Sequence, residues 1–346
     1  MKKIITLCLI IIMAFSVTGC EYYESSRRIS VMTYENGIFD SIQNSESYSG
    51  IRIYATKAKI SYFENLVADE YEENLTTILN EGHDFLWCLE AGGLSTIAKY
   101  ANDYPKMNFG VIDETMENLP SNCISVTFRE YEGGFLAGYI AGLSTKNGKL
   151  GYLAGKETPV TKKYETGFLA GMAYASQETS IPLTCEIVYI GEDYNKQLAK
   201  DAALKLYKVN DCDIIFHSLQ TGGIGAIEAA SSANKLIIGS CTNQATYGSD
   251  AVLVSIIKNT RLAMSNVISK YLAKELQFGV NHEFGIKDRI IDISTSNKLL
   301  DNDIQNKAEE IIAKIKNDEI SVPKNEEELA LFKETLTPPP TEDVKQ

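Results

Sequence analysis

The sequence has few of the residues on which most catalytic and metal sites depend. Its three histidines lie far apart in the chain, so their spacing does not place two metal ligands on one turn. Its seven cysteines include no Cys-x-x-Cys pair, which argues against a zinc or redox centre. The GxSxG and HExxH motifs and the GxxxxGKS/T phosphate loop are absent too. We therefore expect no catalytic residue, no metal and no cofactor.

Positive charge and long apolar runs are also scarce. The chain has 33 lysines and arginines against 46 aspartates and glutamates, a formal net charge of -13, which excludes a broad nucleic-acid-binding surface. After the N-terminus no apolar run reaches the roughly 18 residues of a membrane-spanning helix. The length of 346 residues suggests about two domains.

The N-terminus carries the most specific local signal. Two lysines precede an apolar run over residues 4–15, which is too short to span a bilayer and is typical of a signal peptide. The run leads to Val17-Thr18-Gly19-Cys20, which resembles a bacterial lipobox. We expect residues 1–19 to be a signal peptide, Cys20 to carry acyl chains such as palmitate, and residues 20–28 to be a tether. The alternative is an ordinary signal peptide with a chance cysteine.

The five remaining cysteines, from Cys88 to Cys241, lie mostly in apolar runs and read as small buried side chains. One disulfide stays open as an alternative, because the chain is predicted to be exported.

Short apolar runs alternate with helical patterns from Ile29 onward, which predicts parallel β-sheets covered by helices. We expect an α/β fold of two doubly wound lobes joined by a hinge, with a cleft between them. Lobe 1 should comprise residues 29–145, completed by part of 251–293, and lobe 2 residues 146–250. We also expect a helix over about 40–58, a hairpin over 284–293, and a C-terminal helix with a mobile tail in 294–346.

The stretch from residue 123 to residue 171 holds two helical patterns rich in glycine and alanine. Small residues let helix backbones approach closely, so we expect these helices at the seam between the lobes. Glu130 and Glu132 begin the first helix, where carboxylates complement the helix dipole.

Ligands of parallel sheets bind outside the carboxyl ends of the strands. The candidates by this rule are Tyr34, Glu35, Glu90, Asp113, Tyr194, Gly223, Cys241 and Lys258. The run Gly222-Gly223-Ile224-Gly225 opens a helix. Its N–H groups face the hydroxyl or base of a neutral ligand, face a nucleotide phosphate, or only form a turn. His217 ends a strand, where it either faces the cleft or packs in the core.

Several motifs together resemble the basic membrane protein family of ABC-transporter substrate-binding lipoproteins. The matching segments lie between Ile29 and Ile293 and include VTFREYEGGFLAG (126–138), YIG (189–191), GIG with EAA (223–230), and SIIK (255–258). The resemblance implies a type I periplasmic-binding-protein fold and binding of a nucleoside, whose base lies between two aromatic rings. It further implies that a lysine and acidic residues hold the ribose.

Carried onto this chain, the family pattern matches at Asn44, Gly223 and Lys258. Other positions depart from it: acidic residues of the family fall near Tyr34, Ser95 and Cys241, and one stacking ring is replaced by Gln43. The second ring falls near Asp193 or Tyr194. The implied ligand-binding set is therefore Tyr34, Gln43, Asn44, Ser95, Tyr194, Gly223, Cys241 and Lys258.

The leading functional hypothesis is a lipid-anchored protein on the extracytoplasmic face of the cell membrane. It would be a monomer that binds a nucleoside or related small molecule and delivers it to an ABC permease with its ATPase. One alternative is a ligand-sensing surface lipoprotein of the same fold without transport. Another is an extracellular nucleoside-processing enzyme.

Overall fold

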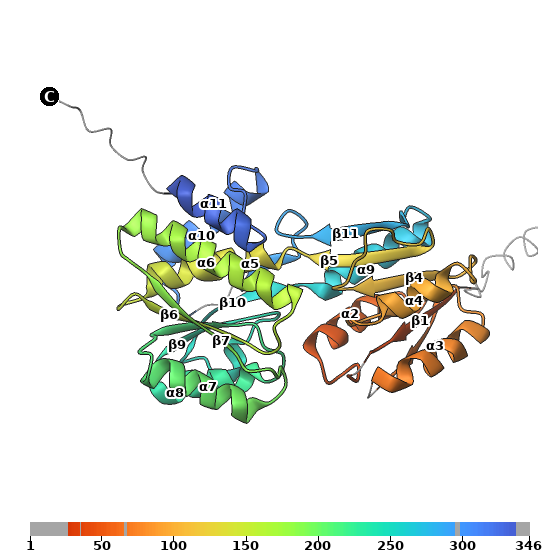
Figure 1. The fold of residues 1–346 in the computed structure, drawn as a ribbon, viewed down its shortest axis with the longest axis horizontal. Coiled ribbons are helices and arrows are strands. Elements are labelled where there is room, and N and C mark those ends of the chain that lie inside the picture. Colours follow the sequence, from red (N-terminus) through yellow and green to blue (C-terminus); the bar gives the residue numbers. More distant parts are fainter. Residues whose placement is uncertain (1–26, 35, 66–67, 295–297, 337–346) are drawn as a thin grey trace, which may run out of the picture.

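The fold consists of two α/β lobes that lie side by side (Figure 1). A computed structural model describes residues 27–34, 36–65, 68–294 and 298–336, so Glu35, the expected signal peptide and Cys20 lie outside the described residues. Each lobe contains one six-stranded sheet within these ranges. This confirms the expected fold class.

The sheet of lobe 1 has the order β11-β5-β4-β3-β1-β2, and all its pairings are parallel. Its strands are β1 (Arg28–Met32), β2 (Lys59–Phe63), β3 (Phe85–Cys88), β4 (Asn108–Ile112), β5 (Cys123–Phe128) and β11 (Val280–Phe284). The sheet of lobe 2 repeats this order as β12-β10-β9-β8-β6-β7, with only the β10–β12 pairing antiparallel. Its strands are β6 (Lys149–Ala154), β7 (Thr184–Tyr189), β8 (Ile214–His217), β9 (Leu236–Gly239), β10 (Val252–Lys258) and β12 (Ile291–Ile293).

Helices cover both faces of each sheet, which explains why the central strands are continuous apolar runs. In β3, Phe85 and Trp87 face one core while Leu86 and Cys88 face the other. One face of the lobe 1 sheet is covered by α2 (Ile42–Arg52) and α9 (Thr260–Ala273). The other face is covered by α3 (Tyr71–Asn80) and α4 (Leu94–Ala101). The short η1 (Ala68–Glu70) precedes α3. One face of the lobe 2 sheet is covered by α5 (Glu130–Ser144), α6 (Pro159–Thr179), α10 (Asn302–Lys316) and α11 (Glu326–Leu336). The other face is covered by α7 (Lys196–Lys208) and α8 (Gly223–Ala233). The short η2 (Ala245–Tyr247) precedes β10.

The chain crosses between the lobes three times, and the crossings lie against one another. They follow Phe128 at the end of β5, Lys258 at the end of β10, and Phe284 at the end of β11. The N–H of Arg129 donates to the carbonyl oxygen of Phe284 at 2.9 Å, which ties the first crossing to the third. We call these three segments the hinge.

The hinge changes two expectations about the chain's division. Helix α5 packs in the core of lobe 2, so residues 130–144 belong there and not to lobe 1. The expected hairpin over 284–293 is wrong, because β11 and β12 join different sheets.

The glycine-rich helices α5 and α6 pack on each other within lobe 2 and do not form a seam between the lobes. A Cβ atom at Gly134 would lie 2.2 Å from the carbonyl oxygen of Tyr164, and one at Gly138 would lie 2.0 Å from that of Phe168. The small residues therefore mark a close contact between helices, as the sequence predicts. The contact lies inside lobe 2 and not between the lobes.

Two helix boundaries also differ from expectation. Helix α2 ends at Arg52, because the following residues turn back and the N–H groups of Lys57 and Ala58 both donate to the carbonyl oxygen of Tyr54. The tail beyond Val322 contains α11, which buries Leu329 and places Phe332 against Phe135 on lobe 2.

Candidate ligand site at the hinge

Lys258 ends β10 of lobe 2, and its side chain reaches groups of lobe 1. Its Nζ lies 3.1 Å from Oε1 of Gln43 in α2 and 3.1 Å from Oδ2 of Asp113, which follows β4. The same Nζ lies 2.8 Å from Oε1 of Glu130, the first residue of α5. One ammonium group therefore joins the two lobes at the hinge.

The surroundings of Lys258 keep it charged although it is only 4% exposed. Burial alone would lower its pKa, but the carboxylates of Asp113 and Glu130 raise the pKa well above the usual lysine value. The ring of Phe128, at the end of β5, lies 4.3 Å from Nζ and adds a cation–π contact.

Glu130 belongs to this buried ion cluster, which corrects its expected role at a helix start. Its side chain is fully buried, and Nζ of Lys163 lies 3.4 Å from its second oxygen. Lys163 also donates to the carbonyl oxygen of Phe128 at 2.8 Å. Two lysines and two carboxylates thus balance at the hinge. We call Lys163, Lys258, Asp113 and Glu130 the hinge ion cluster.

Glu132 likewise does more than complement a dipole, since it holds the third crossing. Its Oε2 accepts the N–H of Ile286 at 2.6 Å, and its Oε1 lies 3.4 Å from Arg129. Burial raises the pKa of Glu132, while the Ile286 N–H and Arg129 act against that rise.

Asp113 was found by the strand-end rule but not by the family pattern. It is the first residue after the apolar run of β4, and its N–H continues the sheet by donating to Val126 at 2.9 Å. Its φ of 61° is in the left-handed region, which turns the chain out of the sheet at this point.

Cys241 lies beside Lys258, at the end of β9. Its carbonyl oxygen accepts the N–H of Lys258 at 2.9 Å, and its φ of 66° turns the chain there. Burial raises the pKa of the Cys241 thiol, and the Lys258 charge acts in the opposite direction. Gln43, Cys241 and Lys258 of the expected set therefore meet at the hinge.

The ring of His217 is buried in the core and does not face the cleft. It packs so closely on Gly223 that no larger residue fits at position 223. A Cβ atom at Gly223 would lie 2.3 Å from Cε1 of His217. Nδ1 of His217 accepts the N–H of Leu219 at 3.3 Å, so Nε2 carries the proton and donates to Oε1 of Gln244 at 2.8 Å. Burial lowers the pKa of His217 to about 4 despite this bond, so the ring is a neutral core group at pH 7.

The loop with Tyr194 lies next to the start of α8, at the same edge of lobe 2. The N–H of Gly222 donates to the carbonyl oxygen of Asp193 at 3.0 Å, and the N–H of Gly223 donates to Gln220 at 3.0 Å. These glycine N–H groups therefore have partners within the loops, as a turn requires. Tyr194 itself is partly buried, and its N–H donates to Oε1 of Glu192 at 2.9 Å.

Tyr34 and Asn44 lie at the facing edge of lobe 1. The ring of Tyr34 meets that of Tyr71 edge to face, with centroids 5.1 Å apart, and its N–H donates to Oε2 of Glu90 at 2.7 Å. Asn44 is fully buried in α2, and its Oδ1 has no partner among the described residues.

Ser95 is exposed in the first turn of α4. The N–H groups of Gly92 and Leu94, which begin that turn, both donate to Oε2 of Glu114, at 2.9 and 3.0 Å. Glu114 thus supplies from within the chain the negative charge that a helix start favours. This carboxylate was not among the residues predicted from the sequence, although Glu114 follows Asp113 directly.

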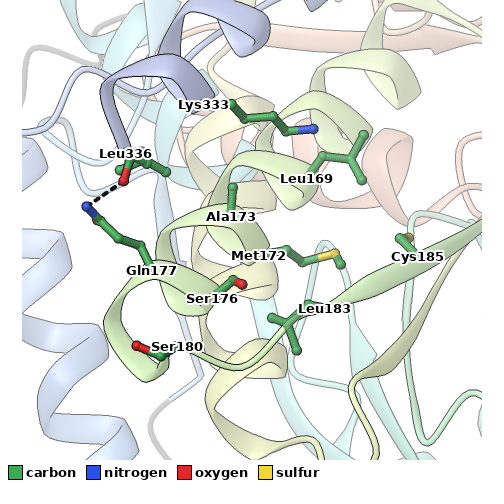
Figure 2. Close-up of a pocket in the computed structure, with 10 residues that line it drawn as sticks. All are labelled: Leu169, Met172, Ala173, Ser176, Gln177, Ser180, Leu183, Cys185, Lys333 and Leu336. Atoms are coloured by element: carbon green, nitrogen blue, oxygen red, sulfur yellow. Dashed lines mark hydrogen bonds between the residues drawn. The ribbon is translucent and has the colours of Figure 1, made fainter. Parts of the chain in front are cut away.

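A cavity of about 630 Å³ lies elsewhere, between α6, α11 and the start of β7 (Figure 2). Gln177 closes one side by donating to the carbonyl oxygen of Leu336 at 2.9 Å. None of the expected ligand-binding residues lines this cavity.

Metal clusters and membrane-spanning helices are both absent from the described ranges. These ranges contain no cluster of histidine, cysteine and acidic side chains suited to a metal ion. Nor is any helix there long and apolar enough to cross a bilayer.

Known proteins resemble this chain both in sequence and in fold. Basic membrane protein A of Borreliella burgdorferi is 29% identical over 96% of this chain and 98% of its own length. The CD4+ T-cell-stimulating antigen of Listeria monocytogenes is 24% identical over 85% of this chain and 87% of its own. Among solved structures, an ABC transporter solute-binding protein from Aeropyrum pernix K1 has a TM-score of 0.78 at 19% identity, covering 90% of this chain and 99% of that one.

The family described as "ABC transporter substrate-binding protein PnrA-like" matches residues 28–326, which include both lobes and the hinge. This match covers most of the chain and agrees with the resemblance seen in the sequence. The chain therefore belongs to the PnrA-like (Bmp) family of ABC transporter substrate-binding proteins.

Proposed function

We propose that the protein is a lipid-anchored, extracytoplasmic receptor that binds a nucleoside or related small molecule between its lobes for uptake by an ABC transporter. The observation that carries this proposal is Lys258, a lobe 2 side chain bonded to Gln43 and Asp113 of lobe 1. A solute that bonded to the same groups would draw both lobes together, and such closure by hinging is common in binding proteins.

Buried polar atoms near the hinge support a polar, uncharged solute. Among the described residues Oδ1 of Asn44, Nε2 of Gln244 and the hydroxyl of Tyr164 are buried without a hydrogen-bond partner. Leaving such groups unpaired is costly, so donors and acceptors of a ligand would be favoured there. Because the hinge ion cluster is already balanced, a neutral ligand fits it better than an ion.

We expect common purine nucleosides to bind weakly, because only one ring of the family's aromatic pair has a counterpart. Gln43 replaces the other ring with an amide that Lys258 already engages. A base gains about 1 to 3 kcal/mol on each aromatic face, so one missing face costs roughly five- to a hundredfold in affinity. Calorimetry with adenosine, guanosine, inosine, uridine and cytidine measures this directly.

Tyr194→Ala should remove the remaining face and weaken any nucleoside binding by roughly five- to a hundredfold. Tyr104→Ala is the control, since Tyr104 precedes β4 at the edge of lobe 1 away from the hinge. Submicromolar binding of a purine nucleoside that Tyr194→Ala leaves unchanged would contradict both expectations.

Solute uptake by cells distinguishes transport from sensing. Normal uptake by cells whose copy of this protein cannot bind the solute would favour sensing over transport.

The anchor is tested at Cys20. We expect Cys20→Ala to leave the signal peptide uncleaved or to release the protein from membranes, because acyl chains on this sulfur supply the membrane affinity. Fractionation of cells followed by mass spectrometry of the N-terminal peptide measures both outcomes. A processed Cys20→Ala protein that stays with the membranes would show that the lipobox assignment is wrong.

A further inference from the structure

The N-terminal ends of the lobe 1 strands form a surface on the far side of the lobe from the hinge. The carboxyl ends of the strands face lobe 2, since Asp113 after β4 and Gln43 after β1 both reach Lys258. At the opposite ends the strand starts lie in line, because the N–H of Lys59 donates to Arg27 and that of Asp84 donates to Arg28, each at 2.9 Å.

The tether joins the protein at this surface. The described chain begins at Arg27, seven residues after Cys20. An extended chain spans at most about 3.6 Å per residue, so Arg27 lies within roughly 25 Å of the lipidated sulfur. If Cys20 is anchored as proposed above, this end of lobe 1 stays close to the membrane.

Basic side chains outnumber acidic ones at these strand starts, although the chain as a whole is acidic. The carboxylates at this edge are those of Glu81, Asp84, Asp103 and Glu275. Six basic residues here form no ion pair with a described carboxylate, and they are Arg27, Lys57, Lys59, Lys106, Lys270 and Lys274. We call them the basic rim. Arg28 is already engaged, with Glu81 3.8 Å away, and Asp84 accepts its N–H. Lys270 lies in the last turn of α9 and Lys274 is its C-cap, but the other four lie outside helices, so dipole complementation does not account for the whole rim.

The rim also contains a cavity of about 440 Å³ lined by two of its cations. Arg27 and Lys274 line it together with Tyr271 and Phe278. Arg27 is held in place, because its guanidinium lies 4.8 Å from the Tyr271 ring centre and donates to the Tyr271 carbonyl oxygen at 3.1 Å. Two cations beside aromatic rings suit a phosphate with attached carbons, and one carboxylate, Asp84, lies at the same wall.

We propose that the basic rim of lobe 1 rests on anionic phospholipid headgroups, with the Arg27–Lys274 cavity as its main contact. This inference rests on the proposed lipid anchor, which holds the rim near the bilayer. Polybasic surfaces next to a membrane attachment point are drawn to anionic lipids, and the attraction is screened by salt. The hinge then faces away from the bilayer in this resting position.

The test is lysine acylation of the mature chain, purified from membranes and reconstituted into vesicles. One set contains phosphatidylcholine alone and the other about 30% phosphatidylglycerol, which carries the negative surface charge. The controls are Lys205, Lys208 and Lys235, which occupy the corresponding strand-start edge of lobe 2. We expect the rim lysines to react at least about threefold more slowly on anionic vesicles, the controls to react equally on both, and about 0.5 M salt to abolish the difference.

A variant with Lys57→Gln, Lys59→Gln and Lys274→Gln should lose the protection of Lys106 and Lys270. Equal reactivity of the rim on both kinds of vesicle, or protection of the control lysines instead, would overturn the proposal. The N-terminal peptide of the same digest reports the anchor separately. If Cys20 carries no lipid, the rim contact can still be tested by co-sedimentation. Sedimentation of the chain with anionic vesicles but not with phosphatidylcholine vesicles would support the rim contact, and no sedimentation with anionic vesicles would reject it.

Discussion

Lys258→Met should lower the free energy of unfolding by about 3 to 5 kcal/mol, because it removes the buried cation that Asp113 and Glu130 share. Glu130 is fully buried and Asp113 nearly so. In the variant Asp113 would have no ion pair among the described residues, and Glu130 would have only Lys163, at 3.4 Å. Methionine fills a similar volume but donates no hydrogen bond. Chemical denaturation at neutral pH measures the change.

Lys200→Met is the matched control for this variant. Lys200, like Lys258, forms an ion pair, here with Glu228 at 2.9 Å, but the side chains of Lys200 and Glu228 are both substantially exposed. An exposed pair contributes roughly 0 to 1 kcal/mol, so the control should stay close to the parent protein. Equal stability of the two variants would contradict the buried cluster.

A triple variant separates the structural role of Lys258 from its role in binding. Adding Asp113→Asn and Glu130→Gln to Lys258→Met removes the uncompensated charges, so we expect it to recover part of the lost stability. Ligand binding should remain weakened by about ten- to a hundredfold, the value of a charge-assisted hydrogen bond of roughly 1.5 to 3 kcal/mol. Recovery of binding together with stability would show that Lys258 acts only on the fold.

The sequence marked Lys258, Gln43 and Asp113 as candidates but did not show that they pair, and the reason is physical. A lysine after an apolar strand is visible in one line of sequence, as is the strand-end position of Asp113. Their pairing depends on how two sheets face each other across three crossings, which strand patterns do not specify. The partners of Lys258 lie 128 to 215 positions away along the chain.

Element types were more predictable than their assignment to lobes. Short apolar runs predicted most strands of the two sheets because these strands bury apolar side chains on both faces. They did not predict β11 (Val280–Phe284), which lies before the expected hairpin over 284–293. They did not show that β11 and β12 separate into different sheets, since a short run such as Ile291–Ile293 reads the same in either. Helix α5 was misassigned for a similar reason: it is buried on all sides, so its pattern points to no particular sheet.

Gly138→Ala should destabilise the protein by more than about 3 kcal/mol, above the usual range for overpacking, because the added methyl meets backbone atoms. Its Cβ would lie 2.0 Å from the carbonyl oxygen of Phe168 and 2.9 Å from the amide nitrogen of Met172. Neither atom can rotate away, so α5 and α6 must separate. The expected loss comes despite alanine's intrinsic helix advantage of about 1 kcal/mol over glycine.

Gly142→Ala, one turn further along α5, is the matched control. A Cβ there would lie 2.6 Å from Cβ of Ala175 and 2.8 Å from Cδ1 of Leu183, which is the end of a flexible side chain. The helix gain is the same, but part of the clash can relax, so the loss should be smaller by about 1 kcal/mol or more. Thermal and denaturant unfolding of the two variants measure the difference. If Gly138→Ala were as stable as Gly142→Ala, the backbone contact between the helices would not limit their spacing, and the glycines would have to be explained by helix flexibility instead.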